Sequence, residues 1–396
     1  MSTCCFFLPL WKGLHLLISP TLLSQLQTAA SQRIEAVVDL AKRICEVPAP
    51  TGHEQERAQF VASLWQERGY TPEIDAVSNV YVRRGKRMDK PVLMLLAHTD
   101  TVFPATTAIK VVRQDNVLRG PAIGDNSVNV AAMLTTLDML DDMHIETECD
   151  IIAVANVGEE GLGNLLGART AVERYREQLG AVIAVDGNLG RIIHRAVGSK
   201  RWRITVHGPG GHSYGSFGKP SAIHVLARII ATIADLNVPA QPKTTFNVGL
   251  IEGGTSVNTI AASASAVLDM RSTDVASLNS LAEQVRAIVE KQSQNNVSTA
   301  IEVLGERPAG ERSQSDPLVQ LAASVLRWLE IEPVYEASST DANIPISLGI
   351  PSLCIGTTKG HDAHTLDEYL EIPPIGKGLA QLSRLCIETC HLIPQQ

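Results

Sequence analysis

Histidines and carboxylates follow short apolar stretches of this sequence in a pattern that could bind metal ions. Four apolar runs of strand length lead into such residues: PVLMLLA (91–97) into His98 and Asp100, IIAVANV (151–157) into Glu159 and Glu160, AVIAV (181–185) into Asp186, and PSLCIG (351–356), through a short loop, into His364. A further acid, Asp125, lies in a Gly/Pro-rich loop just ahead of a predicted helix. Because carboxylates buried together are costly without cations, this pattern predicts a metal site. Imidazole and carboxylate ligands without cysteine suit catalytic zinc, cobalt or manganese better than structural zinc.

Local spacing also suggests separate roles for neighbouring residues. In an extended segment His98 and Asp100 project to the same side, so Asp100 could accept the ring N–H and fix the tautomer of His98 that binds metal. Glu159 and Glu160 are adjacent, so their side chains diverge. One can bind metal while the other faces a water as general base. Two ions sharing a carboxylate would polarise a carbonyl and lower the pKa of that water.

The elements that must position these residues read as an α/β fold. The apolar runs alternate with helical stretches such as VNVAAMLTTLDML (128–140), which predicts a mostly parallel sheet sandwiched by helices. In such sheets ligands bind at the carboxyl ends of the strands. Regular structure is expected from near Ser31, where residues 34–44 place apolar side chains on one helical face. Thr51 and Glu54 read as a capping box that opens a second helix.

The middle of the chain has a different pattern. KRWRITVHG (200–208) alternates between apolar and polar residues, and long helical stretches at 221–236 and 275–292 flank further strands. This pattern predicts an α+β insert, a lid, that interrupts the first domain. The expected division is an N-terminal extension (1–30), a catalytic domain in two parts (31–194 and 309–396) and the lid (195–308).

Composition excludes several classes of protein. The 396 residues carry a formal net charge of −8 with acids and bases interspersed, which disfavours nucleic acid or an anionic membrane as a partner. No apolar run is long enough to predict a spanning helix. The seven cysteines form no CxxC pair, so they are interpreted as buried or idle thiols in a reducing compartment, and a cytoplasmic protein is expected.

The motifs together resemble a known family. HTDTVFP, GDNS, GEEGLG, VDG and HTLDEY occur in the order found in the co-catalytic zinc metallopeptidases of aminoacylase, carboxypeptidase G, acetylornithine deacetylase and peptidase T. The resemblance covers the chain from about residue 31 to its end. It implies a phosphorylase/hydrolase-like catalytic domain and a ferredoxin-like lid through which two copies form a homodimer. Many relatives have a Lys two residues after the Asp that corresponds to Asp125, whereas this chain has Ser127 at that position.

The resemblance also implies roles for individual residues. It assigns the ligands of two divalent ions, expected to be zinc with cobalt or manganese as alternatives: His98, Asp125 and Asp186 for one ion, and Asp125, Glu160 and His364 for the other. Asp125 would bridge the two ions, Glu159 would be the general base, and Asp100 would orient a ligand. In the lid, His212, Asn258 and Arg271 resemble residues that contact substrate, with the His often serving the partner subunit's site. Arg271 is suited to clamp a carboxylate.

A competing pattern lies in the stretch Gly211-His-Ser213-Tyr-Gly215, which matches the G-x-S-x-G motif of serine hydrolases. Asp341 and His364 follow in the order of a triad. However, a nucleophile elbow needs a strand directly before the Ser and a helix directly after it, and glycines and prolines occupy both flanks here. Ser213 is therefore not expected to be the nucleophile.

These observations predict a hydrolase of a peptide or N-acyl amide bond in a small substrate that carries a carboxylate. A water held between the two ions would attack, and Glu159 would transfer its proton to the leaving amine. Two alternatives remain: a non-catalytic metal-binding relative on a peptidase fold, and a serine hydrolase that uses Ser213.

Overall fold

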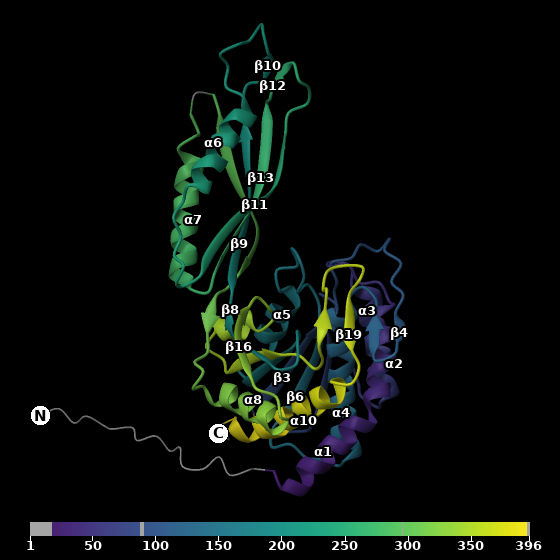
Figure 1. Cartoon of the computed structure of the whole chain (residues 1–396). Helices are drawn as coiled ribbons and strands as arrows, with labels where there is room; N and C mark the ends of the chain where they lie inside the picture. The colour runs from purple at the N-terminus through teal and green to yellow at the C-terminus, as the bar shows by residue number, and fades with distance from the viewer. Residues whose placement is uncertain (1–17, 88–90, 295, 394–396) are drawn as a thin grey trace, which may run out of the picture.

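The chain folds into a larger α/β body and an elongated second body that extends from it (Figure 1). The structure is a computed structural model that describes residues 18–87, 91–294 and 296–393. The first part of the predicted N-terminal extension, residues 1–17, lies outside the described residues. Among the described helices, none combines the length and the apolar character needed to cross a bilayer.

A nine-stranded sheet forms the centre of the larger body. Its strands lie in the order β1 (Glu73–Ile74), β2 (Val80–Arg84), β6 (Asp150–Asn156), β3 (Val92–His98), β7 (Leu179–Val185), β17 (Ser352–Ile355), β8 (Arg191–Ala196) and β15 (Gly310–Glu311), with β16 (Val334–Ser338) also paired to β8. The central strands β6, β3, β7 and β17 are mutually parallel, whereas β2 and β8 join them antiparallel. The mostly parallel sheet is as predicted.

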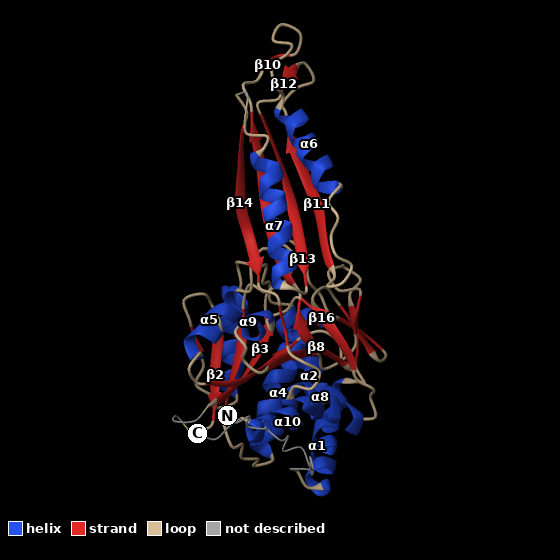
Figure 2. Cartoon of the chain, turned by 90° about the vertical axis from the view of Figure 1, so that its left-hand side faces the viewer, coloured by secondary structure: helices blue, strands red, loops and turns tan. Residues whose placement is uncertain are grey.

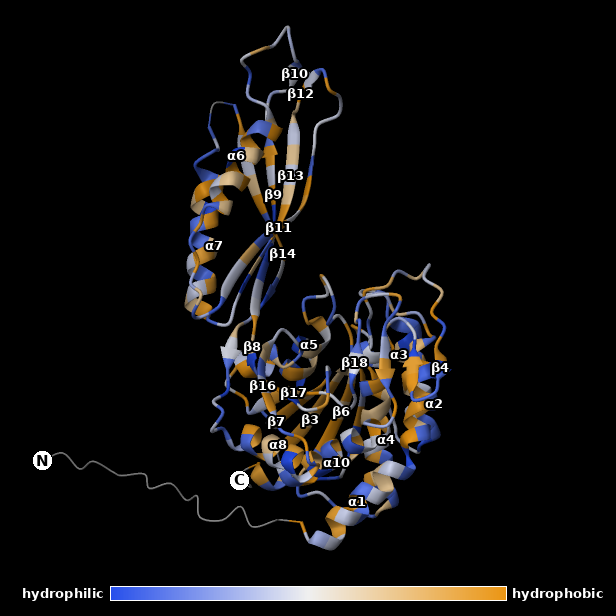
Figure 3. Cartoon of the chain, viewed as in Figure 1, coloured by the Kyte–Doolittle hydropathy of each residue, from blue (hydrophilic) through white to orange (hydrophobic). Residues whose placement is uncertain are grey.

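Helices cover both faces of this sheet, because its central strands are apolar on both sides. Along β3, Leu93 and Leu95 pack into the core beneath the helices α2 (Ile34–Cys45), α4 (Val128–Asp142), α8 (Pro317–Trp328) and α10 (Ile375–Leu392). Met94 and Leu96 point to the opposite face, where α5 (Leu166–Tyr175) and α9 (Asn343–Ser347) lie. Figure 3 shows the hydrophobic residues concentrated in these strands. Helix α3 (Gln55–Glu67) packs beside β1 and β2.

A small antiparallel sheet lies beside the carboxyl ends of the parallel strands. It comprises β18 (Gly360–His361), β19 (Tyr369–Glu371), β5 (Val117–Arg119) and β4 (Val112–Gln114). An irregular turn, η1 (Ile123–Ser127), follows β5 and leads directly into α4. The loop 362–368 between β18 and β19 and the turn η1 therefore meet at this edge of the large sheet.

The second body is the lid, and it has the ferredoxin-like arrangement. Its main elements follow the order β9 (Gly198–His207), α6 (Ala222–Ala234), β11 (Thr244–Gly253), β13 (Ser263–Ser272), α7 (Val275–Glu290) and β14 (Ser298–Arg307). The sheet order β11-β13-β9-β14 is antiparallel throughout, and both helices cover one face (Figure 2). A two-stranded ribbon of β10 (Gly211–His212) and β12 (Thr259–Ile260) forms the far tip of the lid.

Regular structure begins earlier than the sequence analysis expects. Helix α1 spans Pro20–Gln32 and is capped by Ser19, whose side chain accepts a hydrogen bond from the Leu22 N–H at 3.2 Å. Its residues Leu23 and Leu26 are buried in the same core as α10. Part of the proposed extension 1–30 is therefore packed into the larger body. The local sequence could not predict this packing, because it depends on the distant C-terminal helix α10.

The predicted capping box is wrong. Helix α3 begins at Gln55 without a side-chain cap. The Thr51 hydroxyl instead donates to Asp100 Oδ2 at 2.9 Å, and Glu54 Oε1 accepts from the main-chain N–H groups of Gly52 and Gly158 at 2.9 and 3.2 Å. Both side chains instead form hydrogen bonds with polar groups of loops at the sheet edge, because buried polar groups need hydrogen-bond partners.

The interpretation of all cysteines as idle thiols is also corrected. The structure joins Cys149 to Cys390 in a disulfide, with Cα atoms 5.0 Å apart and a separation of 241 residues. A pairing across that separation cannot be read from spacing in the sequence, because it depends on α10 returning to the start of β6. Cys45, Cys354 and Cys386 are buried and free.

Arg57 is expected to be a principal determinant of stability. Its buried guanidinium donates to the carbonyls of Cys45, Val47 and Thr99 at 3.0, 2.7 and 2.7 Å, which ties α3 to the end of α2 and to the loop after β3. Because Arg57→Ala leaves these carbonyls without a donor, it should lower the free energy of unfolding by at least about 3 kcal/mol. Urea unfolding measures this loss. The exposed Arg43 provides the control, since Arg43→Ala should change stability by no more than about 0.5 kcal/mol; equal losses in the two variants would contradict the prediction.

Candidate active site

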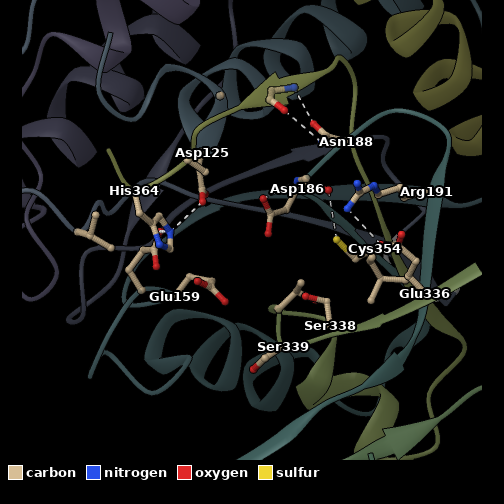
Figure 4. A pocket seen from close by; sticks show the side chains of 18 of the residues that line it. Asp125, Glu159, Asp186, Asn188, Arg191, Glu336, Ser338, Ser339, Cys354 and His364 are labelled. Carbon is tan, nitrogen blue, oxygen red and sulfur yellow. Dashed lines mark hydrogen bonds and ion pairs between the residues drawn. The ribbon is translucent and has the colours of Figure 1, made fainter. Parts of the chain in front are cut away.

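The five predicted metal ligands come together at the carboxyl ends of the central strands. His98 ends β3, Glu160 and Asp186 follow β6 and β7, Asp125 lies in η1, and His364 lies between β18 and β19. Because β6, β3 and β7 are parallel, the residues at their carboxyl ends, Glu160, His98 and Asp186, lie at one edge of the sheet. The segments next to the small sheet supply the other two ligands, Asp125 and His364. Figure 4 shows Asp125, Asp186 and His364 around one open space.

Asp125 lies at the centre of this cluster. Its Oδ1 is 3.1 Å from His98 Nε2, and its Oδ2 is 3.1 Å from His364 Nε2. Glu160 Oε1 is 2.9 Å from the same nitrogen of His364, and Asp186 Oδ1 is 4.0 Å from His98 Nε2. Each oxygen of Asp125 therefore faces a different histidine, with a different second carboxylate on each side.

This geometry fits two divalent ions. Two ligands of a tetrahedral zinc, each about 2.0 to 2.2 Å from the ion, lie about 3.4 Å apart, and the nitrogen–oxygen distances here fall on both sides of that value. Although the buried His98 Nε2 lies 3.1 Å from Asp125 Oδ1, it makes no well-directed hydrogen bond among the described residues. Ligand atoms of His98, Asp125 and Glu160 also lie within 4.8 Å of one another, a grouping that spans the two predicted ligand sets. The contacts of Asp125 favour division into two sets, because one carboxylate oxygen points to each histidine.

Asp100 supports the loop that carries the two adjacent glutamates. Its carboxylate accepts hydrogen bonds from the main-chain N–H groups of Glu159 and Glu160 at 2.9 and 2.8 Å. The Nδ1 atom of His98 lies 3.2 Å from the Asp100 carbonyl oxygen and 3.5 Å from its Oδ1. Asp100 thus contacts the ring nitrogen that faces away from the cluster, chiefly through its main chain.

A second carboxylate, Glu368, supports the turn that carries Asp125. It accepts from the N–H groups of Ala122, Gly124 and Asp125 at 2.9, 2.7 and 2.8 Å. Asn126 adds a link to the end of β7, because its Nδ2 donates to the Val185 carbonyl at 3.0 Å. The two residues therefore hold Asp125 next to the loop that carries Asp186.

Glu159 lies beside the cluster and has a cationic partner of its own. Its side chain is buried, and its Oε1 is 3.1 Å from Arg307 Nη1. A second nitrogen of Arg307 donates to the Glu159 carbonyl oxygen, and Nη1 also lies 3.2 Å from the Ser339 hydroxyl. Figure 4 shows Glu159 facing the same space as Asp186.

The electrostatics of the cluster show an excess of buried negative charge. Burial raises the pKa of Asp186 to about 7, that of Glu368 to about 7 and that of Asp341 to about 6. Burial also raises the pKa of Glu159, although Arg307 acts in the opposite direction. Hydrogen bonds to Asp125 and Glu160 raise the pKa of His364 to about 10. Divalent cations would compensate the buried negative charge and displace protons from the carboxylates and imidazoles that bind them.

A cavity of about 770 Å³ opens beside the cluster, within the range of small-molecule sites. Its walls include Asp125, Glu159 and Glu160 and, from the lid, Arg201 and Arg271. Arg271 also forms an ion pair with Asp269, its Nε lying 2.7 Å from Oδ2. The structure thus places Arg271, which was predicted to bind substrate, at the same cavity as the predicted metal ligands.

The other two predicted lid residues are not brought to this cavity. His212 and Asn258 lie together at the exposed tip of the lid, where the Ser213 N–H donates to the Asn258 carbonyl at 3.0 Å. In Figure 1 the tip, labelled by β10 and β12, points away from the catalytic body. Within one chain these residues therefore do not contact the cluster.

Ser213 has none of the surroundings of a nucleophile. It follows the two-residue strand β10, α6 does not begin until Ala222, and His364 is already paired with Asp125 and Glu160. We expect Ser213→Ala to retain turnover within about twofold, because a nucleophile elbow is absent. A fluorophosphonate probe that labels the wild-type chain at Ser213, together with inactivity of Ser213→Ala, would contradict this expectation.

Comparisons with known proteins match two parts of the chain to peptidase families. Residues 195–297 match the sequence model of the M20 peptidase dimerisation domain, and residues 79–193 match that of peptidase family M28. A peptidase M20 domain-containing protein of Schizosaccharomyces pombe is 26% identical over 265 residues, which cover 63% of this chain and 64% of that protein. A succinyl-diaminopimelate desuccinylase of Corynebacterium glutamicum is 25% identical over 348 residues, covering 85% and 92% of the two chains. Over most of its length the chain is therefore similar to M20 peptidases.

A solved structure shares the fold of most of the chain. The YXEP protein of Bacillus subtilis, described as a dinuclear metal binding peptidase from the M20 family, superposes with a TM-score of 0.68. The match covers 91% of this chain and 99% of that one at 15% identity. The resemblance inferred from the motifs and the expected fold, a catalytic domain with a lid, are thereby confirmed.

Two residues of the site, Arg307 and Glu368, were missed in the sequence, and a third, Asp341, was considered only as the acid of the competing serine triad. Arg307 lies at the end of a lid strand, Glu368 is a loop acid, and Asp341 is buried where its Oδ2 accepts from Asn156 Nδ2 at 2.7 Å. Glu368 stands within the HTLDEY motif, so that motif contained a signal for it. Arg307 is 148 residues from Glu159, and nothing in its local sequence indicates the contact.

Proposed function

We propose that this chain is an M20-type peptidase that hydrolyses a peptide or N-acyl amide bond of a small substrate, with two divalent ions and with Glu159 as general base. The observation that carries the proposal is the position of Asp125 between two histidines, next to a buried glutamate that is free of both predicted ligand sets. His98, Asp125 and Asp186 would hold one ion, and Asp125, Glu160 and His364 the other. When bound, the ions polarise the carbonyl and lower the pKa of the attacking water.

The residues of the chain then supply proton transfer and orientation. Glu159 takes the proton of the attacking water and delivers it to the leaving amine. Asp100 holds the main chain of Glu159 and Glu160 in place, and its contact with His98 fixes the ring of that ligand. Each group is fixed before substrate arrives, which is the condition for efficient general base catalysis.

Arg271 supports the assignment of a carboxylate-bearing substrate. Its guanidinium lines the cavity from the lid and is held at Nε by Asp269, so its planar fork is oriented in advance. We propose that it binds the free carboxylate of the substrate. His212 and Asn258 would reach substrate in the site of a partner subunit, because both lie at the lid tip in the region that matches a dimerisation domain.

The proposal is tested by turnover of a mixed panel of substrates. The purified chain is assayed as prepared, after chelation, and after addition of zinc, cobalt or manganese, against di- and tripeptides, N-acetyl and N-succinyl amino acids and folyl-glutamate-type amides. We expect activity that chelation abolishes and metal restores, because removal of the ions removes their activation of water. An amidated substrate, without its carboxylate, serves as the control and should be turned over at least ~10-fold more slowly. Two bound ions without turnover of any member would favour a non-catalytic metal-binding relative, and activity insensitive to chelation would overturn the metal mechanism.

A further inference from the structure

The base of the lid contacts the active-site loop that carries the two adjacent glutamates. In this loop, residues 157–165, the Glu159 side chain and carbonyl both accept hydrogen bonds from Arg307, the last residue of β14. Two neighbouring contacts reinforce this one: Arg201 of β9 donates to the Gly161 carbonyl, and the Glu306 N–H donates to Asn164 Oδ1 at 2.9 Å. The loop is therefore held between the sheet edge and the lid.

Arg307 is distinctive among these contacts because it is almost wholly buried. Its side chain is 6% exposed and that of Glu159 is 9% exposed, so water contributes little to the solvation of either charge. Burying a guanidinium away from water is costly unless an anion compensates it, and here the compensating carboxylate is that of Glu159, beside the predicted metal ligands. Arg307 Nη1 also donates to the hydroxyl of Ser339, a residue of the catalytic body, at 3.2 Å.

The form of the contact restricts both the main chain and the side chain of Glu159. One nitrogen of Arg307 binds the side-chain oxygen and another binds the carbonyl of the same residue. A planar guanidinium can hold two acceptors in fixed relation, which a lysine ammonium cannot do. The contact uses Oε1 of Glu159 and leaves the other carboxylate oxygen for a water in the cavity.

We propose that Arg307 is a positioning residue that holds the Glu159 carboxylate in the orientation required for proton transfer. This inference rests on the proposed role of Glu159 as general base. Arg307 also lines the active-site cavity, but its hydrogen bonds go to Glu159 and Ser339 and to none of the predicted metal ligands, so it is assigned to act through Glu159. Because proton transfer depends on geometry within about 1 Å, loss of this contact should reduce kcat by about 100-fold. KM should change little, since a positioning defect affects the chemical step more than binding.

The experiment compares Arg307→Ala and Arg307→Lys with a matched lid variant. Arg203 is the control, because it lies on β9 and forms an exposed ion pair with Glu302 at 2.7 Å, remote from the cavity walls. For each full-length, metal-loaded variant, kcat, KM, bound metal and the thermal midpoint are measured. We expect Arg307→Ala to keep both ions and to lose about 100-fold in kcat. Arg307→Lys should remain about 10-fold impaired, because it retains the charge without the fork, and Arg203→Ala should be unchanged.

A chemical rescue separates positioning from a general structural role. Guanidinium chloride, added at millimolar concentrations that leave the thermal midpoint unchanged, should restore part of kcat in Arg307→Ala and none in Arg203→Ala or Glu159→Ala. If Arg307→Ala does not fold, Arg307→Lys carries the test. Values of kcat within threefold of wild type in the folded, metal-loaded variant would overturn the inference, as would a loss that only follows loss of bound metal.

Glu159→Ala in the same preparation distinguishes the two proposals. If Glu159→Ala is inactive and Arg307→Ala is close to wild type, only the positioning role fails. If Glu159→Ala itself retains near-wild-type turnover, the general base assignment fails and the role of Arg307 falls with it.

Discussion

Replacing Glu159 with Ala is expected to reduce kcat by at least ~10³-fold while both metal ions remain bound. The Glu159 carboxylate is buried beside the cluster, but it belongs to neither set of atoms that faces the two histidines. Its removal therefore eliminates proton transfer without removing a ligand. The measurement is kcat on the preferred substrate of the panel, together with metal content by elemental analysis.

Glu159→Gln provides the sharper control for this result. The Gln amide oxygen can still accept from Arg307, so the loop keeps its anchor, yet the amide cannot take a proton. We expect Glu159→Gln to be as inactive as Glu159→Ala. An exposed glutamate of α5, Glu173, supplies the matched surface variant, and Glu173→Ala should retain full activity. Near-wild-type turnover in either Glu159 variant would refute the general base assignment.

The cluster was predictable because strand patterning and ligand chemistry point to the same edge. Apolar runs identify β3, β6, β7 and β17, and parallel strands place the residues that follow them together. The position of Asp125 does not follow from that rule, because it precedes a helix rather than following a strand. Its place depends on Glu368 in a loop 243 residues away, which binds the main chain of the turn.

The parts of the structure that the sequence does not reveal depend on contacts between distant segments. Thr51 and Glu54 match a local capping pattern, yet buried loop groups compete for their side chains and prevail. Helix α1 is fixed by α10, and Cys149 is paired with Cys390, both through the return of the C-terminal helix. Arg307 illustrates the same limitation at the active site, where a lid residue contacts a catalytic loop.

Asp125 is expected to be the ligand whose loss is most severe. Each of its carboxylate oxygens faces a different histidine, so Asp125→Ala removes a ligand from both proposed ion sites at once. We expect the variant to retain less than one tightly bound ion and to lose at least ~10³-fold in turnover, because activation of water depends on the ions. Equilibrium dialysis against zinc, followed by elemental analysis, measures the stoichiometry directly.

Single-site variants show whether Asp125 acts as the bridge. Asp186→Ala and His364→Ala each affect one proposed site, so each should retain about one ion while Asp125→Ala loses both. Asp367→Ala is the matched control, since this acid is exposed in the loop between β18 and β19 and should leave both ions in place. If Asp125→Ala lost only one ion, as Asp186→Ala is expected to do, Asp125 would serve a single site. His98 and His364 would then bind their ions without a shared carboxylate, and Asp125 would not be a bridging ligand.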